Sequence, residues 1–313
     1  MAVSACPVFE MQFSGSGALG AGGNGVLGTS TCAPTLGASG IGDGRTAYSF
    51  DGGDYVNIHT TALQAAFNGL KGSALIWARI TDAGVWSDAT ARVFVRLGTV
   101  GGTADQIQLR KGSTTDRIEL IYRVNGTSYQ VNDTSLAGST NYFLVGLAWD
   151  NAADELKMYL NGSQTGATQT GFAAWVGTLG STVTVIGATN TTPSSPHSGL
   201  LAHCAIFDRD LAAADFAAIY AAQTGDTRGT ILSYGPIAYW MLDEASGTTA
   251  VNLPGTWTDI TSDVRAVTPV AIRYGIHGTG PLDRVAGTGT MKFQLDNGDR
   301  NSGGLLGYYS PDH

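Results

Sequence analysis

The chain has 313 residues, enough for two domains or for one large β-domain with an appendage. Its net charge is −8 and only 13% of its residues are charged, so it lacks the basic surface of a nucleic-acid binder. No apolar stretch reaches the ~20 residues of a membrane helix, so we also exclude a membrane-spanning protein. The 44 glycines favour short strands joined by tight turns.

The first residues, MAVSACPVFEMQF, contain neither the basic start nor the apolar run of a signal peptide. We therefore expect a protein made in the cytoplasm. The cysteines are Cys6, Cys32 and Cys204, an odd number without CxxC spacing, which predicts buried or incidental thiols. A Cys6–Cys32 disulfide is the alternative. The glycine-rich residues 15–44 predict a long surface loop.

From residue 46 onward, apolar segments alternate with turn residues at intervals of about 8–15 residues, which is typical of a β-sandwich or barrel. The predicted strands are residues 47–50, 55–58, 74–80, 92–97, 106–110, 117–124, 128–131, 142–149, 156–160, 182–186 and 200–207. This pattern predicts an all-β fold in which two antiparallel sheets pack face to face.

One helix is predicted after the last of these strands. Asp210 is a plausible N-cap, and Leu211, Phe216 and Ile219 fall close to one face at helical spacing. Gly225 is placed to end the helix. We expect this short helix to pack against the edge of the sandwich.

The remaining residues form a second predicted unit, so that the domains are residues 1–228 and 229–313. The last 60 or so residues contain too little apolar sequence for an independent core. Tyr308 and Tyr309 lie close to the C-terminus, and such aromatic side chains need cover. We therefore predict a small β-rich module that packs on the first domain or is completed by a partner subunit. Trp257, Tyr308 and Tyr309 are its candidate interface residues.

Three segments of the first domain resemble the laminin-G-like, concanavalin-A-like jelly-roll superfamily. They are FDGGDYVNI at residues 50–58, GLAWD with LKMYLNG within residues 146–162, and AIFDRDL followed by the predicted helix at residues 205–220. The resemblance covers roughly residues 46–222. It implies a two-sheet antiparallel jelly-roll sandwich with one short helix.

The C-terminal stretch resembles the N-terminal β-module of tailed-phage minor tail proteins. The matching segments are residues 257–265, 272–276, 289–297 and 306–311. In those proteins the strand that matches residues 289–297 is followed by a longer chain. The resemblance implies a component of a virion, assembled in the host cytoplasm.

The sequence predicts no catalytic residues. It contains no G-x-S-x-G nucleophile motif, and its five histidines lack metal-ligand spacing. Glycosidases of the jelly-roll superfamily place Glu-x-Asp-x-Glu on one strand, where alternate residues share a face. Glu119 has only Arg117, Ile121 and Arg123 at that spacing. We therefore expect a protein that is not an enzyme.

The superfamily resemblance implies calcium and sugar binding in loops at the rim of the sheets. Candidate Ca²⁺ ligands are Asp51 and Asp54 in one loop and Asp150 and Asp154 in another. The alternative is that these aspartates only form Asx turns with their own backbone.

Sugar binding also favours exposed aromatic side chains. Trp86, Trp175 and Trp257 lie in loop-like sequence and are the candidates. Trp77, Trp149 and Trp240 are predicted to be core residues.

We expect a structural protein of a bacteriophage virion, on the tail or the capsid surface, that displays the jelly roll for assembly or host adhesion. Its partners would be other virion subunits, in a homo-oligomer or a hetero-assembly, and cell-surface glycans. One alternative is a carbohydrate-binding lectin module, with or without Ca²⁺. A second alternative is a glucanase-like hydrolase.

Overall fold

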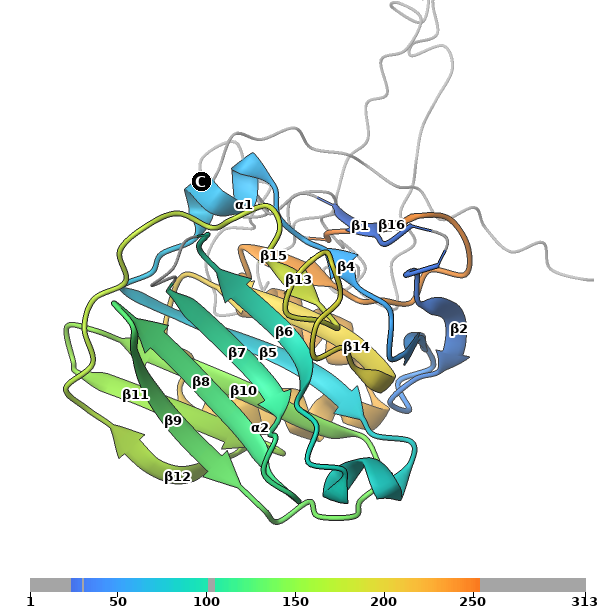
Figure 1. The fold of residues 1–313 in the computed structure, drawn as a ribbon, viewed down its shortest axis with the longest axis horizontal. Helices are drawn as coiled ribbons and strands as arrows, with labels where there is room; N and C mark the ends of the chain where they lie inside the picture. Colours follow the sequence, from blue (N-terminus) through green and yellow to red (C-terminus); the bar gives the residue numbers. More distant parts are fainter. Residues whose placement is uncertain (1–23, 30, 101–104, 254–313) are drawn as a thin grey trace, which may run out of the picture. The chain divides into compact units, whose positions relative to one another are not determined.

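The computed structural model describes residues 24–29, 31–100 and 105–253. All of them fall within the unit Met1–Trp257, and they form two antiparallel sheets packed face to face (Figure 1). This confirms the predicted all-β jelly-roll sandwich. No helix in these ranges is long and apolar enough to cross a membrane.

The front sheet, named for its place in Figure 1, has eight strands. Their order is β16 (Thr249–Ala250), β1 (Gly25–Leu27), β4 (Val56–Asn57), β13 (Val185–Ile186), β6 (Arg92–Gly98), β7 (Gln106–Lys111), β8 (Ile118–Val124) and β9 (Thr127–Asp133). The last four strands form a meander in which each strand pairs with the next along the chain.

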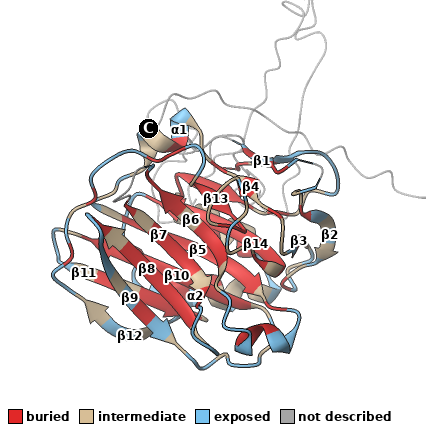
Figure 2. Cartoon of the chain, viewed as in Figure 1, coloured by how far each residue is buried: buried red, intermediate tan, exposed pale blue. Residues whose placement is uncertain are grey.

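The back sheet also has eight strands. Its order is β12 (Ser163–Gln169), β11 (Glu155–Leu160), β10 (Phe143–Asp150), β5 (Lys71–Arg79), β14 (Ser198–Phe207), β3 (Thr46–Asp51) and β2 (Thr35–Ser39), and β15 (Ala238–Trp240) pairs with β14 as well. Every residue of β10 is buried, and so are all residues of β5 except its two ends (Figure 2). Strands buried on both faces need a covering layer on each side.

Short helices provide the outer cover of the back sheet. In α2 (Ala213–Ala221), Phe216 stacks on Tyr159 of β11 at a ring-centroid distance of 4.0 Å. Tyr220, one turn further along α2, stacks on Trp77 of β5 at 5.6 Å. Aromatic packing thus covers the outer face of the back sheet at β5 and β11.

The ends of α2 differ from the prediction. The helix begins after Ala212, whose backbone N–H donates to the Asp215 side chain at 3.0 Å. The predicted cap, Asp210, instead forms an ion pair with Lys71 at 2.8 Å. Gly225 follows the 3₁₀ turn η2 (Ala222–Thr224) that continues from α2.

Further short elements were not predicted from the sequence. They include the helices α1 (Thr61–Ala66) and α3 (Thr227–Ser233) and the 3₁₀ turn η1 (Ala83–Ser87). The strands β1 and β2 lie within residues 15–44, where a long loop was predicted. Both are short and contain a glycine, so no apolar alternation marks them.

Two strands from the predicted second module belong to the sandwich. β15 pairs with β14 beyond the point where β3 stops pairing with it, and β16 pairs with β1 at the edge of the front sheet. The jelly roll therefore includes residues 238–250. The rest of the predicted module, residues 254–313, lies outside the described residues, and the module itself stays a prediction.

Candidate functional site

The outer face of the front sheet carries a row-by-row arrangement of polar side chains on β6–β9. We call it the polar face and define it by the outward side chains of β6–β9. These are Arg96, Gln106, Gln108, Arg110, Glu119, Ile121, Arg123, Ser128, Gln130 and Asn132. In Figure 1 no described segment is drawn across β7, β8 and β9, which face the viewer.

Strand alternation places these side chains outside. Leu97, Ile107, Leu109, Leu120 and Tyr122 all belong to the core between the sheets, so the residues between them point outward. The register then aligns the outward residues in rows across the strands. One row is Arg96, Gln108, Ile121 and Gln130, and the next is Gly98, Gln106, Arg123 and Ser128.

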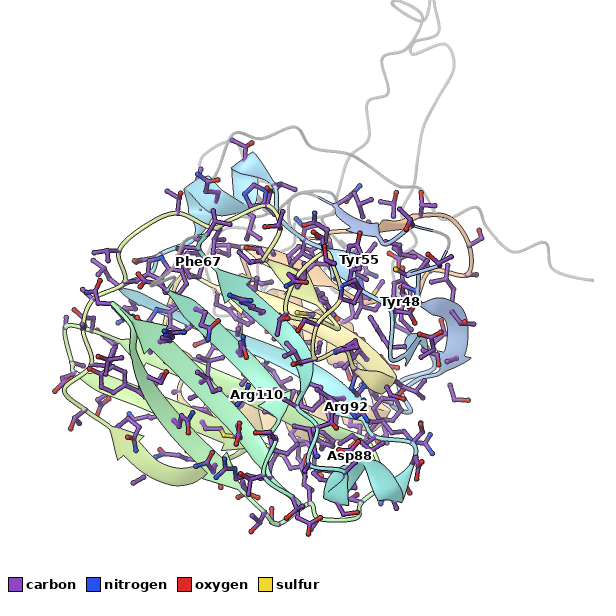
Figure 3. All side chains as sticks on the ribbon, in the orientation of Figure 1. Tyr48, Tyr55, Phe67, Asp88, Arg92 and Arg110 are labelled. Carbon is purple, nitrogen blue, oxygen red and sulfur yellow. The ribbon has the colours of Figure 1, made fainter. Side chains whose placement is uncertain are left out.

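One half of the polar face is neutralised by its own ion pairs. The fully buried carboxylate of Glu119 accepts hydrogen bonds from Arg110 Nε at 2.8 Å and forms a second ion pair with Arg117. Figure 3 shows Arg110 toward the end of β7 that lies near Arg92 and Asp88. Because two guanidinium groups enclose one carboxylate, Glu119 is held as an ion-pair partner and is not free to act on a substrate.

A second charge cluster lies at the end of the meander near η1. Asp88 forms ion pairs with Arg92 and, at 2.9 Å, with the buried ammonium of Lys111. Figure 3 shows Asp88 and Arg92 side by side there. These contacts tie η1 to the strand ends, which is a structural role.

The other half of the polar face holds two arginines without a carboxylate partner among the described residues. Arg96 donates from Nη1 to the backbone oxygen of Thr189 at 2.8 Å, and its Nε is buried without a hydrogen bond. Arg123 forms no ion pair there, and its Nε is likewise buried and unpaired. Burial and the neighbouring charge of Arg123 lower the pKa of Arg96.

Gln108 shares the row of Arg96, lies on β7 between the strands of the two arginines, and is 3% exposed. Its Nε2 donates to Gln106 Oε1 at 3.1 Å, whereas its Oε1 has no hydrogen-bond partner within the described ranges. An amide side chain can donate and accept at once, which suits ligands that carry many hydroxyl groups. The row therefore holds unused hydrogen-bonding capacity.

Trp86 and Trp175 are not exposed aromatic rings, contrary to the sequence expectation. Trp86 is 1% exposed and donates from Nε1 to Ser139 O at 2.7 Å. Trp175 is 7% exposed and packs edge-on against Phe67 at a centroid distance of 5.3 Å. Both loops fold back over the core, so the two indoles contribute to packing and offer no face to a sugar. Trp257, Tyr308 and Tyr309 lie outside the described residues.

The loop of Asp51 and Asp54 does not form a calcium cage in the described structure. Asp51 Oδ1 accepts from Gly53 N and Asp54 Oδ2 accepts from Asp51 N, both at 2.8 Å. Burial and the nearby Asp51 carboxylate raise the pKa of Asp54. Two carboxylates supply fewer oxygens than the 6–8 that Ca²⁺ takes.

The second predicted calcium loop is occupied by other partners. Asp150 Oδ2 accepts from the Lys71 ammonium at 2.8 Å, and its Oδ1 accepts from Ala152 N and Ala153 N. Asp154 Oδ1 accepts from Gly171 N at 2.6 Å. No group of three potential metal ligands occurs among the described residues. The loops thus show the Asx-turn alternative, and calcium binding stays a prediction.

A further cluster of titratable groups is buried beside β14 and β15. His203 Nε2 lies 3.0 Å from Asp43, and its Nδ1 lies 2.6 Å from the Tyr239 hydroxyl. Burial raises the pKa of Asp43, but the hydrogen bond and charge of His203 outweigh it and the net shift is downward. All three side chains are enclosed, so the cluster fastens the strand connections and does not face a ligand.

The cysteines that the structure describes, Cys32 and Cys204, are free thiols. Cys204 is buried in the core, which raises the pKa of its thiol. Cys6 lies outside the described residues, so its predicted pairing with Cys32 stays open.

Comparison with known proteins identifies the family of the sandwich. The family model described as Concanavalin A-like lectin/glucanases superfamily matches residues 50–217. No curated protein sequence matches the chain.

Similar solved structures include sugar-binding and receptor-binding domains. The CBM40 domain of Ruminococcus gnavus IT-sialidase is 14% identical, with 56% of this chain and 96% of that chain covered and a TM-score of 0.46. Domain 4 of the arabinanase AbnA from Geobacillus stearothermophilus, solved with arabinotriose, is 15% identical, with 62% and 86% covered and a TM-score of 0.44. The receptor binding domain of botulinum neurotoxin mosaic serotype C/D is 12% identical, with 66% and 52% covered and a TM-score of 0.48. These likenesses concern the fold alone.

Proposed function

The chain belongs to the concanavalin A-like lectin/glucanases superfamily, and from this premise we propose that it is a non-catalytic, carbohydrate-binding protein whose polar face contacts the glycan. The observation that carries the proposal is the contrast between the two sheets. Aromatic side chains of α2 cover the outer face of the back sheet at β5 and β11, whereas the outer face of β6–β9 in the front sheet carries amide and guanidinium groups.

The residues of the polar face would bind a sugar by hydrogen bonds, because none of them is aromatic and none can stack on a sugar ring. The central residue of this face, Ile121, is only 5% exposed, and the polar residues Gln108, Gln130 and Asn132 lie beside it on β7 and β9. Sugar hydroxyls both donate and accept hydrogen bonds, as amide side chains do. Preformed strands hold these groups in fixed positions, which lowers the entropic cost of binding.

The absence of a free acid pair on this face supports a binding role over hydrolysis. A retaining glycosidase needs two carboxyl groups about 5–5.5 Å apart, one acting as acid and one as nucleophile. Glu119 is the single carboxylate among the residues that define the polar face, and Arg110 and Arg117 enclose it.

A glycan array probed with the full chain tests the proposal, with and without Ca²⁺. We expect binding to at least one glycan class in the absence of Ca²⁺. Gln108→Leu combined with Gln130→Leu should weaken that binding about tenfold, because each lost hydrogen bond contributes roughly 0.5–1.5 kcal/mol. Gln164→Leu on β12 is the matched control, because this exposed glutamine lies on the back sheet. Failure to bind any glycan in either condition would overturn the function.

The virion role predicted from the sequence rests on residues 257–311, which lie outside the described residues. A position on a phage tail or capsid, and assembly with other virion subunits, therefore stay predictions. A glycan-binding jelly roll is compatible with host adhesion by such a particle, and gel filtration of the full chain tests the assembly part. A stable monomer would count against it.

A further inference from the structure

We propose that the glycan bound by the polar face is acidic, and that its anionic group, a carboxylate or a sulfate, binds between Arg96 and Arg123. The inference rests on the carbohydrate-binding function proposed for the same face and specifies the class of ligand. It follows from the positions of the two guanidinium groups, from their lack of carboxylate partners and from the buried polar atoms beside them.

The Arg96 side chain lies close to Gly98 on the same strand. A Cβ atom built on Gly98 would lie 3.0 Å from Arg96 Nε and 3.5 Å from its Nη2. The guanidinium therefore extends along β6 and lies over Gly98, where the missing side chain leaves room for it. This brings the charge of Arg96 into the row that continues through Gln106 to Arg123.

The strands that carry the two guanidinium groups are separated by one strand, β7. Arg96 and Arg123 stand on β6 and β8 with β7 between them, so their strands are roughly 9.5 Å apart. Gln106 and Gln108 fill the interval on β7. A sugar lying across β7 can thus reach both guanidinium groups and the two amides together. A guanidinium fork matches the paired oxygens of an anionic group.

The polar face and the adjoining Arg117 carry more arginines than carboxylates. Four arginines, Arg96, Arg110, Arg117 and Arg123, share one carboxylate, and the ion pairs of Glu119 use two of them. The excess of positive charge is local, because the whole chain carries −8. Burial lowers the pKa of Arg96, and the charge of Arg123 lowers it further; a bound anion would relieve this repulsion between the two arginines.

The carboxylate of Asp105, which directly precedes β7, does not neutralise Arg123. Its Oδ1 accepts from Asn125 N at 3.0 Å and its Oδ2 accepts from Val176 N at 2.7 Å. Asp105 therefore serves the backbone of two loops. Residues 101–104, which join β6 to β7, have the sequence Gly-Gly-Thr-Ala and bring no charge.

Three buried polar atoms on Arg96, Arg123 and Gln108 lack a hydrogen-bond partner among the described residues. The Nε atoms of Arg96 and Arg123 and the Oε1 atom of Gln108 are all buried without a hydrogen bond within the described ranges. Native proteins satisfy the large majority of such atoms, so a group of three in adjacent rows needs an explanation. A ligand anchored on these side chains would shift them onto polar partners.

The experiment measures binding of the full chain to matched glycan pairs that differ only in the acidic group: neutral against carboxylated, and neutral against sulfated. We expect the acidic member to bind at least tenfold more tightly, with an affinity that falls as salt rises. Arg96→Gln and Arg123→Gln should each remove most of that preference. Arg209→Gln changes the net charge equally at an exposed site outside the polar face and should leave it intact.

The outcomes separate the inference from the function. Equal binding of neutral and acidic members, or a preference that survives both arginine substitutions, overturns the acidic ligand and leaves carbohydrate binding in place. No binding to any glycan overturns the function itself. Thermal unfolding of each variant checks the fold, and Arg123→Gln keeps the test decisive if Arg96→Gln does not fold.

Discussion

The arginines of the polar face show how neighbouring residues of one type acquire different roles. Arg110 and Arg117 pair with a buried carboxylate, whereas Arg96 donates to a backbone oxygen and neither Arg96 nor Arg123 forms an ion pair with a described residue. Strand register makes this distinction, because it decides which row contains Glu119. The chemistry of the face is thus set by single positions on β6, β7 and β8.

Gly98 is the residue that gives Arg96 its place, and Gly98→Ala tests this directly. The new Cβ would lie 3.0 Å from Arg96 Nε and 3.2 Å from Val183 O, closer than ordinary contacts, so the guanidinium must move. We expect the affinity for acidic glycans to fall about tenfold, the equivalent of one charge-assisted hydrogen bond of roughly 1.5 kcal/mol. Isothermal titration calorimetry measures the change. Gly225→Ala, whose Cβ finds its nearest neighbour at 3.7 Å, should bind as the wild type does.

His197 makes the stability of the sandwich sensitive to acid. Burial, together with the charge of Arg92, lowers the pKa of this histidine to about 3. Below pH 6.5 the unfolded chain takes up a proton that the folded chain excludes, so the free energy of unfolding falls as the pH falls. The expected slope approaches 1.4 kcal/mol per pH unit between about 6.5 and 3.

His197→Leu supplies the control for this pH dependence. The variant has no imidazole to titrate, so its free energy of unfolding should fall less steeply with acid than that of the wild type. Urea unfolding followed at several pH values between 7 and 4 gives both curves. Identical slopes for the two proteins would show that His197 does not carry the effect.

At the scale of elements, the strands from the C-terminal flank complete the jelly roll. Tyr239 and Trp240 on β15 are fully buried, and Trp240 lies in the core between the sheets. β15 takes the position beside β14 that β3 leaves free. The sandwich is therefore assembled from segments on both sides of its central meander.

Trp240→Ala tests the contribution of β15. Removing a buried tryptophan leaves a cavity, and such truncations destabilise by roughly 3–5 kcal/mol. We expect a loss of this size in the free energy of unfolding, measured by urea unfolding with tryptophan fluorescence. Val176→Ala, at a side chain that is 56% exposed, should change it by less than ~0.5 kcal/mol. An unchanged stability in Trp240→Ala would mean that β15 adds little to the sandwich.

The elements that could be predicted from the sequence are those whose burial follows from a continuous run of apolar residues. Continuous apolar runs such as residues 74–80 and 142–149 correspond to the central strands β5 and β10, buried on both faces. The strands β1, β2 and β16 could not be predicted, since each is short and depends on a partner distant in the chain. The N-cap of α2 was misassigned because a tertiary ion pair with Lys71 holds Asp210.

The polar residues of the candidate site alternate with apolar residues in the sequence, but the sequence alone does not identify them as a binding site. Gln106, Gln108 and Arg110 alternate with apolar residues on β7, as Glu119 and Arg123 do on β8. Alternation predicts an outward polar face, but it does not reveal which charges are paired, because pairing depends on register between strands. Trp86 and Trp175 were proposed because loop sequence normally indicates exposure, and here the loops fold over the core.

At the scale of the whole molecule, the two outer faces of the sandwich differ in what covers them. α2 and the aromatic cluster beneath it cover β5 and β11 of the back sheet, whereas no described helix packs on the outer face of β7–β9 in the front sheet (Figure 1). This asymmetry joins the fold to the proposed function. A glycan bound at the rim loops, as the sequence predicted, would leave the polar face unused.

The most direct test is NMR mapping of the bound glycan on the full chain of 32.3 kDa. The amide and side-chain resonances of wild-type protein are compared before and after addition of the best ligand from the array. The polar face predicts shifts that cluster on Gln106, Gln108, Ile121, Arg123 and Gln130. Shifts that cluster instead on the loops of residues 51–54 or 150–154, with the β6–β9 resonances unchanged, would contradict it.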